Sequence, residues 1–241
     1  MRRRACRARR PIRRHGAGPV NEVVPLERIA TSERVAEEVR RLIWTGDLAA
    51  GDRLNQDEIA HLFGVSRIPV REALITLAHA GVVTMTLHRG AFVVPLTAEA
   101  VRDHYELYAL VDGFALGKTV ERDGDLDALA EDFRSAARSA DDEELFTKVI
   151  AARRRLHGLG GSPRFDAVAG GLVGLVPGNF FAEVPGTGEV ARCRLPLVAD
   201  ALAQRRTDDA VVAYSSMLRE QGRLVVRVLA ANGALVKDDA P

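Results

Sequence analysis

Residues 56–77 read QDEIAHLFGVSRIPVREALITL. Apolar side chains recur at helical spacing on both sides of Gly64, which predicts two short helices joined by a tight turn at that glycine. Ala60 allows the helices to approach closely, and a small shared core is predicted to contain Ile59, Phe63, Val65, Val70 and Ala73. The stretch is therefore predicted to be a helix-turn-helix, which presents its second helix to the major groove of DNA.

Both helices of this motif carry sequence signals at their first residues. Asn55 is placed to cap the first helix and Ser66 the second, because a short polar side chain accepts a hydrogen bond from a free N–H of the first turn. Pro69 is tolerated three residues after Ser66, since first-turn N–H groups lack helical partners. Arg67 and Arg71 are four residues apart and share the face opposite the apolar one. One face is predicted to pack and the other to contact DNA.

The flanking segments complete a small domain. Apolar spacing predicts a helix over residues 31–45, and residues 46–52 are predicted to form a turn. From Val82 to Val94 the period changes to two around His88-Arg89-Gly90, which predicts a β-hairpin. A winged helix-turn-helix domain is thus expected over residues 26–97, with those three residues at the wing tip.

No strand pattern recurs after residue 97. Six helices are predicted, over residues 98–122, 125–139, 142–159, 164–176, 189–205 and 208–232. Proline and glycine mark a loop between the fourth and the fifth of them. The predicted fold class is mainly α, with the winged domain followed by an all-α helical bundle over residues 98–234 and a frayed tail over 235–241.

Composition indicates a soluble, cytoplasmic protein. Hydrophobic residues make up 47% of the 241 residues and charged residues 28%, and no apolar run approaches the roughly 18 residues of a membrane span. Two cysteines make neither a disulfide framework nor a zinc ligand set. The chain has no Ser-His-Asp grouping, no paired carboxylates with metal-ligand spacing and no Gly-rich phosphate loop, so an enzyme is not predicted.

Charge is distributed unevenly along the chain. Residues 1–15 hold eight arginines and no acid, which predicts a disordered basic arm over residues 1–25 that adds sequence-independent affinity for phosphates. The alternative is that translation begins nearer Val20. Residues 26–97 contain eight arginines, no lysine and nine acids, a net charge of −1. DNA binding must therefore rest on a few placed arginines, with Glu33, Glu37 and Glu38 turned away from the DNA.

The residues at 64–74, 80–83 and 89–93 closely resemble the DNA-binding domain of the GntR family of bacterial transcription regulators, over about residues 30–97. The helical remainder, which opens with YELYALVDG at 105–113, resembles the effector-binding domain of the fatty-acid-regulator (FadR, FCD) branch. The resemblance implies a homodimeric repressor or activator that binds a pseudo-palindromic operator in double-stranded DNA and responds to a small molecule. It assigns DNA contacts to Ser66, Arg67, Arg71, His88, Arg89 and Gly90.

Residue chemistry is consistent with that assignment. An arginine fork can accept guanine O6 and N7 together, and a wing arginine suits the narrow minor groove. The alternative is that Arg67 and Arg71 form only a solvated helix face.

The helical domain departs from the metal-binding pattern of that branch. Many members bind a divalent metal through an Asp and a His four residues apart and two later histidines, which together hold a small carboxylate. Here His104 and His157 are the only histidines beyond the wing. Depending on the register, Arg153 replaces either the aspartate or the histidine, and the aspartate is lost in both cases. No metal and no cofactor are therefore expected.

Four residues are candidates for a ligand site in place of the metal. Tyr108 stands where the branch usually has a pocket arginine and Asp112 where it has a glutamate. Arg153, close to His157, is placed to hold a carboxylate by a two-pronged hydrogen bond. The alternative is that Arg153, Arg154 and Arg155 are a solvated basic stripe and His157 an ordinary half-buried histidine. In that case the chain would be a ligand-independent regulator or an architectural DNA-binding protein.

Overall fold

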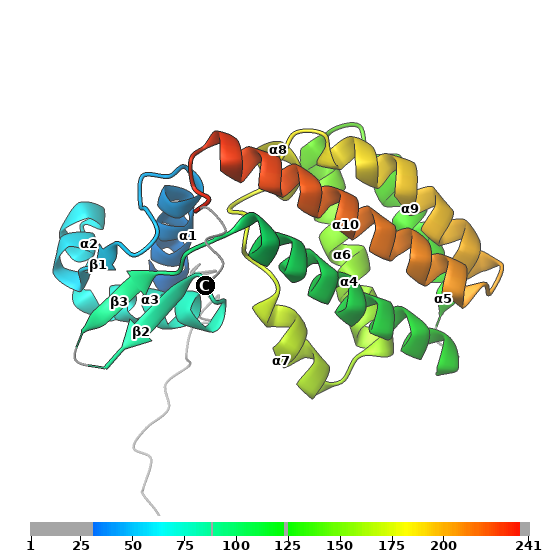
Figure 1. Ribbon diagram of the computed structural model, residues 1–241. Helices are drawn as coiled ribbons and strands as arrows, with labels where there is room; N and C mark the ends of the chain where they lie inside the picture. Colours follow the sequence, from blue (N-terminus) through cyan, green and yellow to red (C-terminus); the bar gives the residue numbers. More distant parts are fainter. Residues whose placement is uncertain (1–30, 88, 123–124, 237–241) are drawn as a thin grey trace, which may run out of the picture.

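The structure is a computed structural model that describes residues 31–87, 89–122 and 125–236 (Figure 1). Its first part consists of α1 (Thr31–Trp44), β1 (Arg53–Leu54), α2 (Gln56–Phe63), α3 (Arg67–His79), β2 (Val83–Thr86) and β3 (Gly90–Val93). The rest is helical: α4 (Ala98–Glu121), α5 (Leu126–Ala137), α6 (Asp142–Gly160), α7 (Pro163–Gly171), α8 (Phe180–Glu183), α9 (Thr187–Ala203) and α10 (Thr207–Ala231). The predicted fold class, a winged helix-turn-helix followed by an all-α bundle, is confirmed.

The helix-turn-helix forms as its sequence predicts. Gly64 adopts a left-handed φ of 63°, which lets the chain turn sharply between α2 and α3. Asn55 caps α2 by accepting a hydrogen bond from the N–H of Asp57. Ser66 occupies the cap position of α3, but its side chain accepts no capping hydrogen bond. The predicted cap is therefore positional only, and the Ser66 hydroxyl remains available for another partner.

The wing carries a third strand that the sequence pattern did not indicate. β2 and β3 pair antiparallel as predicted, and β1 adds to the other side of β3, with Arg53 opposite Phe92 and Leu54 opposite Ala91. Two residues are too short to show an alternating pattern, so residues 46–54 looked like a turn alone. The small sheet closes over the core below α1 and α3, where Leu54, Leu74 and Val93 are buried.

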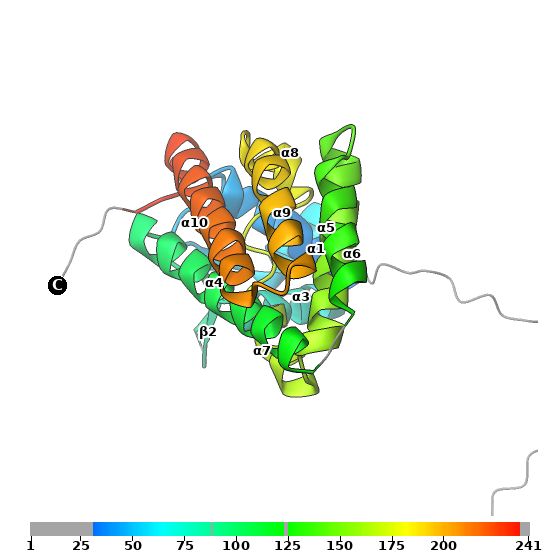
Figure 2. The ribbon, with the colours of Figure 1, turned by 90° about the vertical axis from the view of Figure 1, so that its right-hand side faces the viewer.

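The helical part is a bundle whose longest helices lie side by side. Seen from the bundle side, α4 and α10 lie on one side, α5 and α6 on the other, and α9 between them (Figure 2). The predicted bounds hold to within about two residues except in one region. The helix predicted over 164–176 ends at Gly171, because the Gly170-Gly171 pair weakens it and Gly174 adopts a φ of 99°. The short helix α8 lies in the predicted loop and was missed.

The two parts share a packed seam. Trp44, at the end of α1, is buried among residues of the bundle, including Tyr105, Val225 and Leu229. Asn232 donates from Nδ2 to the Trp44 carbonyl at 2.9 Å. Val236 donates its N–H to the Leu96 carbonyl at 2.9 Å, and Leu235 packs against the same cluster. The frayed tail predicted from residue 235 is therefore not what the structure shows for Leu235 and Val236; residues 237–241 lie outside the described part.

Within the described residues, no helix is both long and apolar enough to cross a membrane. The basic arm predicted over residues 1–25 also lies outside the described part of the chain.

Candidate DNA-binding surface and ligand cavity

The second helix of the motif, α3, presents a polar face to solvent. Val70, Ala73, Leu74 and Leu77 are fully buried against the core. Ser66 and Arg71 are exposed, and 72% of the Arg67 side chain is accessible. The predicted division of α3 into a packing face and a free face is confirmed, because arginines at helical spacing point away from the apolar stripe.

One of the two arginines already has an acidic partner. Arg67 forms an ion pair with Asp57 of α2, whereas Arg71 forms no ion pair with any described residue. The exposed pair contributes little to stability in water. Arg67 can therefore exchange Asp57 for a base or a phosphate at small cost, while Arg71 brings a free guanidinium.

The wing places further polar groups beside α3. Arg89 is exposed, and its N–H donates to the Thr86 carbonyl at 3.0 Å to close the turn. Gly90 has a φ of 104°, which side-chain-bearing residues rarely adopt. His88, the third residue predicted at the wing tip, lies outside the described part of the chain.

Two exposed residues of this surface escaped the sequence reasoning. Ile68, next to Arg67 on α3, is 71% exposed, and an apolar side chain in that position can contact a thymine methyl group. Arg53 of β1 is exposed, and its Nε would lie 3.5 Å from a Cβ placed on Gly90. An isoleucine flanked by arginines was the available signal for Ile68, whereas Arg53 depended on the unpredicted strand pairing.

The four predicted ligand residues come together inside the bundle. Asp112 of α4 is fully buried, and its carboxylate accepts hydrogen bonds from Arg153 Nε at 2.9 Å and Nη2 at 3.3 Å. His157 Nε2 lies 2.9 Å from Asp112 Oδ1. The Tyr108 ring covers the guanidinium, with Arg153 Cζ 4.2 Å from its centroid. Arg153 is thus not part of a solvated stripe, and its two-pronged bond is made to Asp112.

A fifth member of this cluster comes from the far end of the chain. The Tyr214 hydroxyl of α10 donates to Asp112 Oδ2 at 3.2 Å, from a fully buried position. Nothing in the sequence near Tyr214 indicated this role, because the two residues are 102 positions apart.

The cluster fixes the protonation of its members. Burial acts to raise the pKa of the Asp112 carboxyl, but the hydrogen bond from His157 and the charge of Arg153 outweigh it, so this pKa lies below its usual value. Burial raises the pKa values of Tyr105, Tyr108 and Tyr214 above that of free tyrosine. The carboxylate is therefore charged and the three phenols are neutral hydrogen-bond donors at neutral pH.

A cavity of about 240 Å³ lies beside the cluster. Its walls are mostly apolar and aromatic, and include Phe146, Val149, Leu172, Val176, Phe180 and Met217. Tyr105, Tyr108 and Arg153 also line it. Neither tyrosine hydroxyl nor Arg153 Nη1 has a hydrogen-bond partner among the described residues. An apolar space with a few convergent donors is the usual form of a small-molecule site.

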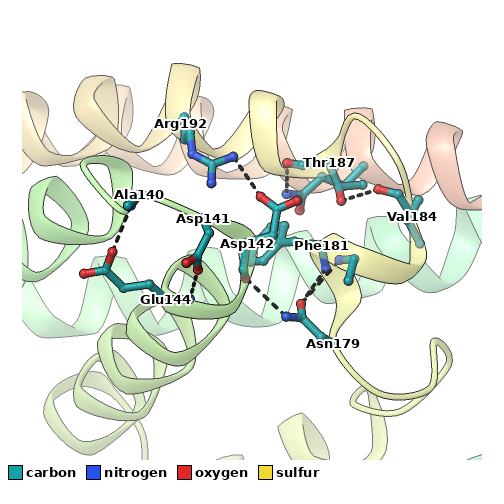
Figure 3. A network of polar contacts seen from close by, with 11 residues as sticks. Ala140, Asp141, Asp142, Glu144, Asn179, Phe181, Val184, Thr187 and Arg192 are labelled. Carbon is teal, nitrogen blue, oxygen red and sulfur yellow. Dashed lines mark hydrogen bonds and ion pairs between the residues drawn. The ribbon is translucent and has the colours of Figure 1, made fainter.

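A polar network holds the wall of this cavity in place (Figure 3). Asn179 caps α8 by accepting from the N–H of Phe181, and its Nδ2 donates to the Asp142 carbonyl at 3.2 Å. Arg192 of α9 binds the Asp142 carboxylate at 2.8 Å. The start of α6, α8 and α9 are thereby joined, which positions Phe180 and Phe181 at the cavity.

Among the described residues, no three His, Cys, Asp or Glu side chains are grouped closely enough to hold a metal ion. Asp112 is already occupied by Arg153 and His157, which supplies a positive charge where a metal would otherwise supply it. The expectation of a metal-free site stays a prediction.

Comparison with known proteins identifies the DNA-binding segment. The sequence model of the family described as "Bacterial regulatory proteins, gntR family" matches residues 31–93. An uncharacterized HTH-type transcriptional regulator of Mycobacterium tuberculosis is 32% identical over 158 residues, which cover 64% of this chain and 64% of that regulator. The gluconate operon transcriptional repressor of Bacillus subtilis is 36% identical over 98 residues, which cover 41% of this chain and 40% of the repressor. Each match spans less than two thirds of the relative's length.

Solved structures share the architecture. Lar, which controls the expression of the Listeria monocytogenes agr system, is 21% identical with a TM-score of 0.57, over 82% of this chain and 97% of Lar; this likeness shows the fold alone. A candidate GntR transcriptional regulator from Rhodococcus sp. RHA1 is 27% identical with a TM-score of 0.52, over 83% of this chain and 98% of that one. Residues 31–93 are therefore a GntR-family helix-turn-helix domain, joined here to a helical bundle.

Proposed function

We propose that this chain is a cytoplasmic transcription regulator of the FadR/FCD branch of the GntR family, which binds operator DNA through α3 and the wing. The observation that carries this proposal is the exposed polar face of α3 within the family-matched segment, where Arg71 has no acidic partner. The relatives named above are transcription regulators, one of them a repressor. No reaction is proposed for the chain.

The proposed DNA contacts divide by groove. Arg67 and Arg71 would read base edges in the major groove, where an arginine fork binds guanine O6 and N7. Ser66, whose hydroxyl makes no cap, would bind a phosphate. Arg89, Gly90 and His88 would contact the minor groove or its phosphates. The arm at residues 1–25 would add salt-dependent affinity without sequence preference.

The proposed regulator acts as a homodimer on a pseudo-palindromic operator. A two-fold axis would place two copies of α3 in successive major grooves, about one helical turn apart. An exposed apolar stripe on α4, made of Leu107, Leu110 and Phe114, supports this proposal. Their spacing of three and four residues puts them on one face of the helix, and such a patch on a folded protein marks a contact surface.

The proposed effector is a small monocarboxylate with an apolar body. Arg153 Nη1 and the neutral hydroxyls of Tyr105 and Tyr108 are all donors, so they suit an acceptor such as a carboxylate. Asp112 balances the charge of Arg153, which disfavours a ligand with two or three carboxylates in this apolar cavity. No metal and no cofactor take part in this proposal.

DNA binding is tested by selecting sites from a random double-stranded library and measuring Kd on the selected site by fluorescence anisotropy. Arg71→Ala should weaken binding roughly 10- to 100-fold, because a bidentate arginine-guanine contact is worth about 1–3 kcal/mol. Arg154→Ala, which removes an exposed arginine of α6, is the matched control and should bind like the wild type. An unchanged Kd for Arg71→Ala would refute the assignment of α3 as the reading helix.

The same DNA complex separates two forms of the proposal. Titration with benzoate, phenylacetate and octanoate should change the anisotropy if the cavity is a sensor, and citrate should not. If none of the acids has an effect, the ligand-independent alternative is favoured while the DNA-binding assignment stands.

A further inference from the structure

One wall of the ligand cavity belongs to the DNA-binding unit. Glu37 lines the cavity, although it lies on α1 and not in the helical bundle. Its Oε1 accepts a hydrogen bond from the N–H of Gly178, and its Oε2 accepts from Arg40 Nη1 at 2.7 Å. Both carboxylate oxygens are therefore engaged, one of them across the boundary between the two units.

The partner of Glu37 is a segment that forms much of the cavity wall. We call residues 172–178, between α7 and α8, the cavity loop; Leu172 to Val176 and Gly178 all line the cavity. Two of its glycines, Gly174 and Gly178, have φ angles of 99° and 62°. At Gly174 an added Cβ would lie 3.2 Å from Arg40 Nε, so α1 touches the loop at two points. Beyond the loop, Arg41 binds Glu183 of α8 at 3.3 Å.

These three contacts come from one face of α1. Glu37, Arg40 and Arg41 are three and four residues apart and so lie together on the helix. The opposite face carries Val35, Ala36 and Val39, which are buried in the core that α1 shares with α3. Helix α1 therefore lies between the cavity loop and the helix that is proposed to read DNA (Figure 1).

We propose that Glu37 is a positioning residue that couples occupancy of the cavity to DNA binding, by holding the cavity loop against α1. The inference rests on the proposed function, since it names how that site is read. A ligand that displaces the cavity loop must alter the Glu37–Gly178 hydrogen bond. Because α1 and α3 share one close-packed core, the displacement is passed to the reading helix as a shift of the whole unit and is not absorbed locally.

Coupling between two sites is reciprocal, so operator DNA can serve as the probe without a known effector. Hydrogen exchange of the full chain is measured with and without the selected DNA site. In the wild type, DNA binding should change the exchange rate of peptides covering the cavity loop by about fivefold or more, the lower end of allosteric couplings. Glu37→Ala, which removes the acceptor of the Gly178 N–H, should abolish this change while the protection of α3 by DNA persists.

Two further variants separate positioning from a loss of fold. Glu37→Gln keeps an oxygen that can accept from Gly178 and should restore the response of the loop. Glu33→Ala removes an exposed acid from the same helix and should behave as the wild type. All variants are compared by thermal unfolding.

The outcomes distinguish this inference from the proposed function. If DNA protects α3 but leaves the cavity loop unchanged in the wild type, or if Glu37→Ala responds like the wild type, the coupling role of Glu37 is refuted and the DNA-binding assignment stands. If the wild type selects no DNA sequence at all, the proposed function fails, and this inference fails with it.

Discussion

At the scale of single residues, Asp112 carries the heaviest electrostatic load in the bundle. It is fully buried and receives hydrogen bonds from Arg153 and Tyr214 as well as contacting His157. A buried ion pair adds little net stability compared with apolar packing, but removing one member leaves the other charged and without a partner. The four residues therefore stand or fall together, whatever ligand the cavity accepts.

Asp112→Asn should lower the free energy of unfolding by about 3–5 kcal/mol at pH 7, because the Arg153 charge stays buried without its counter-ion. Urea unfolding followed by circular dichroism measures the difference. Since the folded-state pKa of Asp112 is lowered, its contribution is present above the unfolded-state value of about 3.9 and is lost as the pH falls through the folded-state value. The gap between variant and wild type should therefore narrow at pH 3.

The control for this comparison is Asp127→Asn, which breaks an exposed ion pair with Arg205 at 3.3 Å. Exposed pairs are worth about 0–1 kcal/mol, so this variant should unfold almost as the wild type does. Equal losses for the two variants would contradict the central role given to Asp112.

At the scale of elements, the close approach of α4 and α6 depends on a glycine. Gly160, the last residue of α6, packs against the Ala115 carbonyl of α4, and a Cβ at this position would clash with that backbone oxygen and come within 2.7 Å of Thr119 Oγ1. Gly158 on the same helix has nothing within 4 Å of an added Cβ. The two glycines thus provide a matched pair.

Gly160→Ala should destabilise the protein by about 1–3 kcal/mol, the usual effect of overpacking. Gly158→Ala should be neutral or stabilising by up to about 1 kcal/mol, since alanine favours a helix. Thermal and urea unfolding distinguish the two. If the variants share one midpoint, the tight packing of α4 on α6 at Gly160 is not a determinant of stability.

The sequence predicted those elements whose signals are local. The apolar periods of α2, α3 and the wing, and the glycine at position 64, lie within about 30 residues, so the DNA-binding unit was predictable almost to the residue. The cavity was not, because its parts come from distant positions: Glu37 meets Gly178 across 141 residues and Asp112 meets Tyr214 across 102. The resemblance brought Tyr108, Asp112, Arg153 and His157 together, but only the fold shows that Arg153 is paired with Asp112.

At the scale of the whole molecule, the two units are joined by a seam that runs from Trp44 to Val236. It buries the end of α1 in the bundle, so a rearrangement of the bundle is transmitted to the DNA-binding unit through packed contacts and not through a free linker. In the proposed dimer, the same seam would set the separation of the two reading helices. Operator affinity would then depend on the pairing of the bundles.

The α4 stripe makes that dependence testable. Leu110, 63% exposed between Leu107 and Phe114, is at the centre of the stripe. In a two-fold interface the same patch meets itself, so Leu110→Glu buries two like charges at one contact. Sedimentation equilibrium should show a dimer for the wild type and a monomer for this variant, and operator affinity should fall by about tenfold or more because a monomer binds one half-site only.

Leu197→Glu places the same charge on α9, where Leu197 is similarly exposed, and should leave both mass and affinity unchanged. A Leu110→Glu protein that still sediments as a dimer would exclude the α4 stripe as the interface. A variant that is monomeric yet binds the full operator with wild-type affinity would show instead that the two half-sites are occupied independently. The cavity would then have to act within a single chain, through Glu37 and α1 alone.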